Sequence, residues 1–397
     1  MILEKLEAYY NYFSQRKAGW FILLCTSLLM GLGLIILSSA SLSFIKSENY
    51  FHKQLLWCAL GVPLFFIGCF VDLKFLKKHC LGILAFFVVA LVIVLVPGIG
   101  KMVNGSRRWI AMGGFNVQVS EFSKIAIILW LAQYLNNSEG NRSDFRIGFF
   151  NPLLVVASIC GLIFLEPDYG TAMLVGAVTV TLLFLAGTRL WYIGIAIFGG
   201  LLAISILIYL NPTRMGRIVA FLDVENNKLA GAYQLWQGML GFASGGLYGR
   251  GLGQGRQQLV YLPEAHTDFI FPIFSEELGS LAAILVLAVY LTFFLTITHS
   301  AKKLHSNFAK FLSYGIALTI IYQVIINVGV VTGLLPTKGM GLPFISYGGS
   351  NLVLLSFMVG LLLNCFSADQ REGARHNSNE EQLRKPTKRE LISPYTR

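Results

Sequence analysis

The chain has 397 residues, of which 55% are hydrophobic and 13% are charged, and its formal net charge is +11 at pH 7. The charged share is about half that of an ordinary soluble domain, so the composition excludes a soluble globular fold. Positive charge can indicate nucleic acid binding, but here the basic residues sort to one side of the predicted spans. That sorting favours a membrane protein without a nucleic acid partner.

The chain opens with a polar segment, residues 1–19, that is unsuited to a cleavable signal peptide. Its apolar residues Ile2, Leu6, Tyr9 and Phe13 fall on one helical face, which predicts a cytoplasmic amphipathic helix lying on the membrane surface. Apolar runs close to bilayer length follow and predict ten membrane-spanning helices. The predicted spans are Trp20–Ile45, Gln54–Val71, Cys80–Val96, Phe122–Leu135, Phe149–Leu165, Thr171–Gly187, Leu190–Leu210, Phe269–Ile297, Phe311–Val331 and Asn351–Phe366.

The ten spans form one domain, residues 20–366, and we expect an all-α polytopic membrane bundle with both termini on the same side. With that side assigned to the cytoplasm, 19 Lys and Arg residues lie inside, 11 lie outside and Lys124 lies within a span. This positive-inside bias predicts cytoplasmic termini. The fourth and tenth runs are short for a bilayer, so we expect both helices to extend into their polar flanks.

Two segments outside the predicted spans differ from ordinary connections. The longest outer connection, residues 211–268, precedes the eighth span and holds nine glycines between Gly231 and Gly255, and its size favours a functional loop. The C-terminal tail, residues 367–397, is polar and charged with few aromatic residues, so we expect it to be a disordered cytoplasmic segment.

Charged side chains within the spans are candidates for a functional site, because each costs about 2.5–3.5 kcal/mol at the centre of a membrane helix. Glu121 and Lys124 lie three residues apart on one face near the outer end of the fourth span, which favours a site. Glu276 and Glu277 open the eighth span. For this second pair, charges that are neutralised and hold helices together are as good an explanation as a site.

Four carboxylates lie outside the membrane near the ends of predicted spans. Glu166 and Asp168 separate the fifth and sixth spans, while Glu264 and Asp268 flank His266 just before the eighth. A carboxylate in such a place can deprotonate a sugar hydroxyl or hold a divalent cation against a diphosphate. Asp168 and Asp268 can equally be helix N-caps, and the spacing by itself favours capping for each.

The glycine-rich run at residues 249–255 superficially resembles a dinucleotide-binding loop. It lacks the full spacing and a preceding strand, so no organic cofactor is expected there. Its glycines, together with Arg250, Arg256 and Gln257, suit an anion-binding surface for a lipid diphosphate. A flexible outer loop explains the same composition about as well.

Prolines and glycines also break the chain between the ninth and tenth spans, at Pro336–Gly339 and again at Pro343–Ser350. Irregular backbone at membrane depth is tolerated where it lines a cavity enclosed by protein. The pattern therefore predicts a re-entrant segment beside a site, although a structural turn would also account for it. Lys338, Ser346 and Ser350 are its candidate binding residues.

Several of these segments resemble the signature motifs of one family, the SEDS proteins (shape, elongation, division and sporulation). The matching segments are Asn104–Ile110, Gln118–Lys124, Glu166–Gly170, Leu262–Phe271, Glu276–Gly279 and Pro343–Ser350. The resemblance extends from the first predicted span to the tenth. Pro336–Gly339 and Glu264–Asp268 look more like the division members of the family than the elongation or sporulation members.

The resemblance implies a ten-helix peptidoglycan glycosyltransferase of the bacterial cytoplasmic membrane, acting at the division septum. Such an enzyme polymerises lipid II onto an undecaprenyl-linked glycan strand on the outer face. Its implied partners are a class B penicillin-binding protein acting as transpeptidase and other division proteins. The essential carboxylate of the family maps onto Asp268, and the Glu-x-x-Lys motif maps onto Glu121 and Lys124, where the lysine can pair with the aspartate across the cavity.

In the implied inverting reaction, Asp268 is the base or holds a divalent cation, Mg²⁺ or Mn²⁺, and one carboxylate suffices because no covalent intermediate is needed. Candidate contacts to the diphosphate are Arg107, Arg108 and Arg256. Further substrate-binding candidates are Glu166, Asp168, His266, Lys338, Ser346 and Ser350. The alternatives are a lipid II flippase, because transporters share a cavity, broken helices and embedded charges, and a non-catalytic scaffold of the division complex.

Overall fold

The computed structural model describes residues 2–43, 50–103, 106–112, 115–257, 262 and 264–384. Its longer helices are α1 (Ile2–Ser43), α2 (Tyr50–Phe70), α3 (Leu73–Leu95), α4 (Val119–Asn137), α5 (Asn151–Leu165), α6 (Tyr169–Leu185), α7 (Leu190–Tyr209), α8 (Pro212–Leu222), α9 (Tyr233–Gly245), α10 (Ile270–Lys302), α11 (Asn307–Val331) and α12 (Gly349–Arg384). Short helical turns cover Glu139–Asn141 and Arg146–Phe150. The strands are β1 (Gly100–Val103), β2 (Ser106–Met112) and β3 (Phe115–Gln118).

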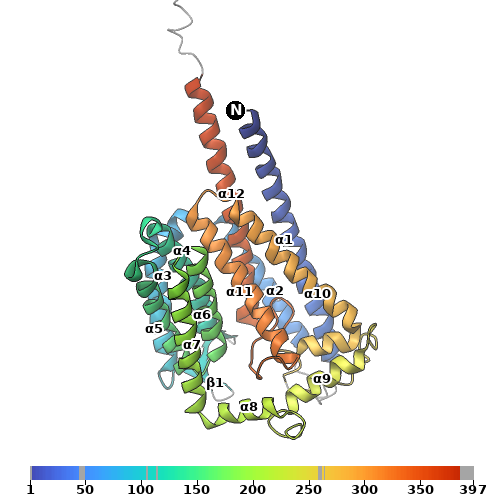
Figure 1. Cartoon of the computed structure of the whole chain (residues 1–397). Coiled ribbons are helices and arrows are strands. Elements are labelled where there is room, and N and C mark those ends of the chain that lie inside the picture. Colours follow the sequence, from blue (N-terminus) through green and yellow to red (C-terminus); the bar gives the residue numbers. More distant parts are fainter. Residues whose placement is uncertain are drawn as a thin grey trace, which may run out of the picture.

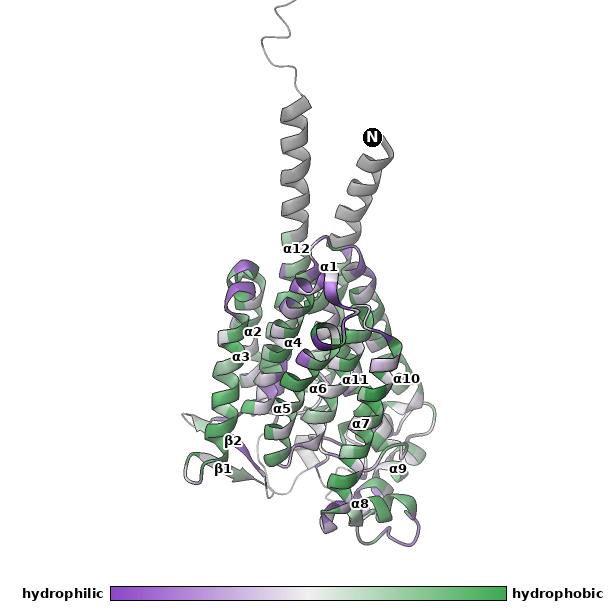
Figure 2. Cartoon of the chain, turned by 60° about the vertical axis from the view of Figure 1, so that its left-hand side comes forward, coloured by the Kyte–Doolittle hydropathy of each residue, from purple (hydrophilic) through white to green (hydrophobic). Residues whose placement is uncertain are grey.

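Within the described residues, eight helical segments are long and apolar enough to cross a membrane. α6 is apolar but shorter, and α4 packs in the interior against α3, α6 and α11. Together these helices match the ten predicted spans, with α10, α11 and α12 as the eighth to tenth. α4 and α12 extend into polar flanks as expected. Hydrophobic residues dominate the middle of the bundle (Figure 2). The prediction of an all-α polytopic membrane protein is confirmed.

The helices at the two ends of the chain extend beyond the predicted spans. α1 continues without a break from Ile2 into the first span, so the helical backbone does not separate a surface-lying segment at residue 19. No proline interrupts that stretch. α12 likewise continues to Arg384 through residues for which the composition predicted disorder. Ala, Glu, Gln and Arg recur there and are good helix formers. α1 and α12 leave the bundle at the same end (Figure 1).

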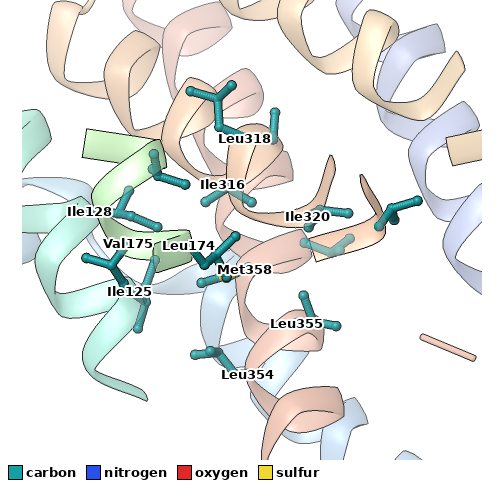
Figure 3. Packing of buried hydrophobic residues seen from close by; sticks show 14 of the residues in the cluster. Ile125, Ile128, Leu174, Val175, Ile316, Leu318, Ile320, Leu354, Leu355 and Met358 are labelled. Atoms are coloured by element: carbon teal, nitrogen blue, oxygen red, sulfur yellow. The ribbon is translucent and has the colours of Figure 1, made fainter. Parts of the chain in front are cut away.

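Part of the hydrophobic core lies where α4, α6, α11 and α12 meet (Figure 3). Ile128 of α4, Val175 of α6, Ile316 of α11 and Leu355 of α12 are among the buried side chains of this cluster. Helices surrounded by neighbours do not need one apolar face, which is why α4 buries residues on all its sides. The polar residues that α4 carries are therefore held inside the protein.

At the end of the bundle opposite to where α1 enters lie the strands and the helices α8 and α9 (Figure 1). The segment between α3 and α4 forms an antiparallel sheet in the order β1-β2-β3. The long connection before α10, expected as a loop, contains the two helices α8 and α9. The connection is consequently more helical than the long loop that the sequence predicted.

α10 is bent near its start, where Gly279 has a φ of 88° and a ψ of 166°. A left-handed φ of this kind is cheap only for glycine. The glycine-rich segment 246–257 packs against the bend through backbone hydrogen bonds, including Arg250 N–H to Glu276 O at 2.9 Å and Ser280 N–H to Gly246 O at 2.9 Å. The segment expected to be a flexible loop or an anion-binding surface is thus part of the packed fold.

The carboxylates of Glu276 and Glu277, which are 0% and 1% exposed, hold this same segment. Glu276 accepts hydrogen bonds from Ser244 Oγ and from the backbone N–H groups of Arg256 and Gln257, each at 3.0 Å. Glu277 accepts from Ser39 Oγ of α1 at 2.7 Å and from the N–H of Gly253 at 3.1 Å. Of the two explanations for this pair, the structure supports the one that holds helices together.

Candidate functional site

A cavity of about 1150 Å³ opens between the sheet, the ends of several helices and residues 332–348. These residues connect α11 to α12 by irregular backbone and include the predicted re-entrant segment, a name that we keep for them. Its walls come from α2, β2, β3, the N-terminal end of α4, the α5–α6 connection, α8, the residues before α10, and residues 337–351. Seven of the predicted site residues line it: Arg108, Glu121, Asp168, Asp268, Lys338, Ser346 and Ser350. Segments far apart in sequence therefore meet at one polar chamber, as expected for a ligand site.

Asp168 is the most heavily bonded carboxylate of the cavity wall. It caps α6, accepting from the N–H and Oγ1 of Thr171 at 3.2 and 2.9 Å. It also accepts from Gln118 Nε2 at 3.0 Å and lies 3.3 Å from Arg108 Nη1. Burial alone would raise the pKa of Asp168, but Arg108 and the Thr171 hydrogen bonds together hold that pKa below its ordinary value. Asp168 is thus an ionised helix cap, the role that its spacing favoured.

Asp268 is different. Phe269 is the N-cap of α10 and no side chain caps that helix, so the capping role considered for Asp268 is wrong. Among the described residues, no hydrogen bond reaches its carboxylate. Burial, then repulsion from Glu264, raises the pKa of Asp268 from 3.8 to about 7 although Arg108 opposes the shift. Asp268 therefore offers the cavity a carboxylate that can gain and lose a proton near neutral pH.

The re-entrant segment brings a glycine against this carboxylate. A Cβ placed on Gly339 would lie 2.8 Å from Asp268 Oδ2, so a larger residue there would displace this flexible carboxylate. Lys338, which directly precedes Gly339, is one of the basic residues that line the cavity. Burial lowers the pKa of Lys338 from 10.5 to about 7, with Asp168 acting against the shift. Its Nζ lies 3.0 Å from Met173 Sδ.

Two arginines of α8 also line the cavity and were not among the predicted candidates. The guanidinium of Arg214 stacks on the Tyr169 ring at 3.3 Å and its Nη2 donates to Pro167 O at 3.1 Å. Arg217 lines the same chamber one turn further on. The signal for them is the amphipathic pattern of Pro212–Leu222, which follows directly after the seventh span.

The two serines predicted as binding residues have structural partners. Ser346 Oγ accepts from the N–H of Leu342 at 2.6 Å and so closes the turn of the re-entrant segment. Ser350 Oγ accepts from the N–H of Gln118 at 3.1 Å and donates to Asn116 O at 3.4 Å, which fixes β3 to the start of α12. Both hydroxyls shape the cavity wall.

Glu121 and Lys124 form an ion pair of 2.9 Å between Glu121 Oε2 and Lys124 Nζ, with side chains 11% and 3% exposed. Glu121 lines the main cavity, whereas Lys124 points to a small apolar void among α4, α6 and α11. The expected pairing of Lys124 with the aspartate across the cavity is therefore replaced by a pair within α4.

The remaining candidates lie off the cavity wall. Arg107 points away from Arg108, as neighbours on a strand do, and its Nη1 donates to Leu95 O at 3.4 Å. The side chain of Arg256 is exposed beside the α10 bend. His266 stacks on Tyr50 with 3.9 Å between ring centroids. Glu166 is 0% exposed, and burial, followed by repulsion from Asp168, raises its pKa from 4.5 to about 8.

Known proteins are similar to this chain in sequence and in fold. The family model described as cell cycle protein, FtsW/RodA/SpoVE, matches residues 19–371. "Probable peptidoglycan glycosyltransferase FtsW" of Coxiella burnetii is 39% identical over 353 residues, which cover 86% of this chain and 94% of that protein. "Stage V sporulation protein E" of Bacillus subtilis is 38% identical over 353 residues, covering 86% of this chain and 95% of that protein.

Two solved structures share the fold. A chain from "Structural coordination of polymerization and crosslinking by a peptidoglycan synthase complex" superposes with a TM-score of 0.71 at 24% identity, covering 88% of this chain and 98% of that one. The Thermus thermophilus rod shape determining protein RodA superposes with a TM-score of 0.67 at 24% identity, covering 88% and 97%. Matched over most of its length by the family model and by relatives above 30% identity, this multi-pass membrane protein belongs to the FtsW/RodA/SpoVE family of cell cycle proteins.

Proposed function

We propose that this protein is a peptidoglycan glycosyltransferase that polymerises lipid II into glycan strands at the outer face of the cytoplasmic membrane. The observation that carries the proposal is Asp268, a carboxylate without a hydrogen bond from the described residues, facing a cavity that also holds Arg108, Arg214, Arg217 and Lys338. One free carboxylate beside several cations is the arrangement that glycosyl transfer from a lipid diphosphate requires. The names of the curated relatives agree with this activity.

In the proposed reaction, the 4-hydroxyl of the acceptor sugar attacks the anomeric carbon of the lipid-linked strand. Asp268 takes the hydroxyl proton as the new C–O bond forms and the bond to the diphosphate breaks. A base whose pKa is about 7 is well matched to this task at neutral pH. Arg108 and Lys338 stabilise the departing diphosphate. Inversion at carbon needs no covalent intermediate with the enzyme, so a second carboxylate is not required.

A divalent cation, Mg²⁺ or Mn²⁺, belongs to this proposal as the alternative role for Asp268. Among the described residues no group of three or more His, Cys, Asp or Glu side chains could hold a metal ion. Mg²⁺ nevertheless binds commonly through one or two carboxylates together with substrate phosphates, which the carboxylate of Asp268 and a diphosphate would provide. Bound there, the ion would neutralise developing negative charge.

The cellular setting is a further part of the proposal: action at the division septum, with a class B penicillin-binding protein as transpeptidase, other division proteins as partners, and cytoplasmic termini. The bias of basic residues supports this orientation. A cysteine placed at Asn227 should react with an impermeant thiol reagent in intact spheroplasts, and one at Asn377 should not. The reverse labelling pattern would place the cavity on the wrong side for wall synthesis.

The test is polymerisation of lipid II by the purified protein, alone and with its transpeptidase partner, in detergent without a membrane gradient. We expect glycan strands from the wild type and none from Asp268→Asn. A protein that moves lipid II across liposome bilayers but makes no strands would be a flippase, and one that does neither would be a scaffold. Glu264→Gln is the control, because it removes a nearby carboxylate that is not assigned to the reaction.

A further inference from the structure

Buried carboxamides hold the re-entrant segment next to Asp268. Asn327 and Gln323 lie one turn apart on α11 and are 2% and 1% exposed. Gln323 Nε2 donates to Gly341 O at 2.8 Å. Asn327 Nδ2 donates both to Met340 O at 2.7 Å and to Asp268 O at 2.8 Å. These side chains satisfy carbonyl groups that irregular backbone leaves without a partner inside a membrane protein.

Asn327 does more than supply a hydrogen-bond donor to the re-entrant segment, because one of the two carbonyl groups that it bonds belongs to Asp268. The other partner, Met340, follows directly after Gly339, where an added Cβ would meet Asp268 Oδ2. The side chain of Asn327 therefore ties the backbone of Asp268 to the stretch of chain that limits where its carboxylate can lie. Gln323 makes the same kind of bond to Gly341 but does not bond to Asp268.

We infer that Asn327 is a positioning residue that sets the Asp268 carboxylate for attack through its two backbone hydrogen bonds. The inference rests on the proposed function. It differs from a purely structural role in its consequence. A misplaced base slows the chemical step while leaving substrate binding intact, whereas loss of packing lowers the amount of folded protein.

The chain supplies a matched control at the other end of the bundle. Asn364 of α12 also donates from one Nδ2 to two backbone carbonyls, Gly68 O at 3.0 Å and Val71 O at 2.6 Å. These carbonyls lie at the end of α2 and just beyond it, away from the residues that line the cavity. Asn364→Ala removes two hydrogen bonds of the same kind as those lost in Asn327→Ala, but neither of them reaches Asp268.

The experiment measures kcat and KM for lipid II polymerisation, together with thermal unfolding, on the full-length protein with its partner. We expect Asn327→Ala to lower kcat by roughly 10²-fold with KM unchanged, the loss typical of a misplaced reacting group. Asn364→Ala should keep the wild-type kcat. Combined with Gly339→Ala, which crowds Asp268 Oδ2, Asn327→Ala should lower kcat by less than the product of the two single effects.

A folded Asn327→Ala protein with wild-type kcat would overturn the inference, and so would independent, multiplying effects of Asn327→Ala and Gly339→Ala. If Asn327→Ala does not fold, Asn327→Ser, which keeps one donor, decides: an intermediate kcat supports the inference and a wild-type kcat overturns it. An active wild type with an unaffected Asn327 variant sinks the inference alone. An inactive wild type overturns the proposed function and the inference with it.

Discussion

Two acidic regions of this protein have the same charge and opposite characters, one fully buried at the bend of α10 and one half-buried at the cavity wall. At the bend of α10, Glu276 and Glu277 accept hydrogen bonds from backbone N–H groups and serine hydroxyls. On the cavity wall, the Asp268 carboxylate accepts none from the described residues. Both regions were candidates for a site on the basis of sequence, because each placed carboxylates at the start of the same span. Hydrogen-bond donors and exposure to the cavity separate the two regions.

The difference has a physical basis. A buried carboxylate that accepts several backbone hydrogen bonds is stabilised in its charged form and organises the loop that donates them. A buried carboxylate without donors is destabilised when charged, so its affinity for a proton or a cation rises. The first arrangement contributes to the folded state, and the second keeps reactivity available for a ligand.

The largest effect expected from this comparison is a loss of the lipid II polymerisation rate in the Asp268→Asn variant. Loss of a general base typically costs about 10²–10⁴ in rate. The same variant should unfold at a temperature at least as high as the wild type, since it removes a charge that burial disfavours. Glu276→Gln should show the opposite pattern, because one acceptor oxygen becomes a donor facing backbone N–H groups. Unpaired buried donors cost about 1–3 kcal/mol each.

Strand formation from lipid II and thermal unfolding, measured on both variants, check this prediction. Ser244→Ala is a suitable control at the bend, because it removes one donor to Glu276 and leaves the backbone donors in place. Equal losses of activity and stability in Asp268→Asn and Glu276→Gln would abolish the distinction between the two regions.

The Glu121–Lys124 pair is the next test, because its carboxylate is held by a partner within the protein and also lines the cavity. Lys124→Ala leaves Glu121 buried without its cation, and breaking a buried pair typically destabilises a protein by about 3–5 kcal/mol. Replacing both members, as Glu121→Gln with Lys124→Met, should restore most of the stability measured by unfolding. We expect the double variant to remain slower than the wild type, because Glu121 lines the cavity. A stable double variant with full activity would make the pair purely structural.

The sequence predicted the fold well because long apolar runs leave a chain little choice in a membrane. Candidate residues that adjoin a helix end, such as Asp168 and Asp268, lie on the cavity wall, and their roles there stay predictions. The site predictions missed Asn327 and Gln323, since a carboxamide inside a span gives no sign of the carbonyl groups that it meets. They also placed Arg107 and Arg256 wrongly, because the facing of a strand and the docking of a glycine-rich segment depend on tertiary contacts.

The pH dependence of activity offers a finer test. Asp268 must be ionised to act, so activity should rise with pH through about 7. Because the folded-state pKa lies above 3.8, the stability that this group contributes is present at low pH and is lost as the pH rises through about 7. Glu264→Gln removes a repulsive neighbour and should move the acidic limb of the rate profile to lower pH. An unmoved limb at fixed cation concentration would exclude Asp268 as its source.

The smallest effect on activity is expected at Glu166, which is fully buried and does not line the cavity, whereas Asp268 is half-buried at the cavity wall. Burial raises its pKa to about 8, so Glu166 carries a proton at neutral pH and Glu166→Gln changes little there. As the pH rises through about 8, the wild type must ionise this buried carboxyl and loses stability, whereas the variant does not. The difference in unfolding temperature between the two should therefore grow between pH 7 and pH 9, with Asp268→Asn as a reference whose own difference develops nearer pH 7.

Activity of Glu166→Gln at pH 7 should stay close to that of the wild type. A large loss of polymerisation activity in a stably folded Glu166→Gln protein would contradict this prediction. It would mean that a carboxylate without hydrogen-bond donors can be reactive wherever it lies, and that the exposure to the cavity that distinguishes Asp268 from Glu166 is not needed.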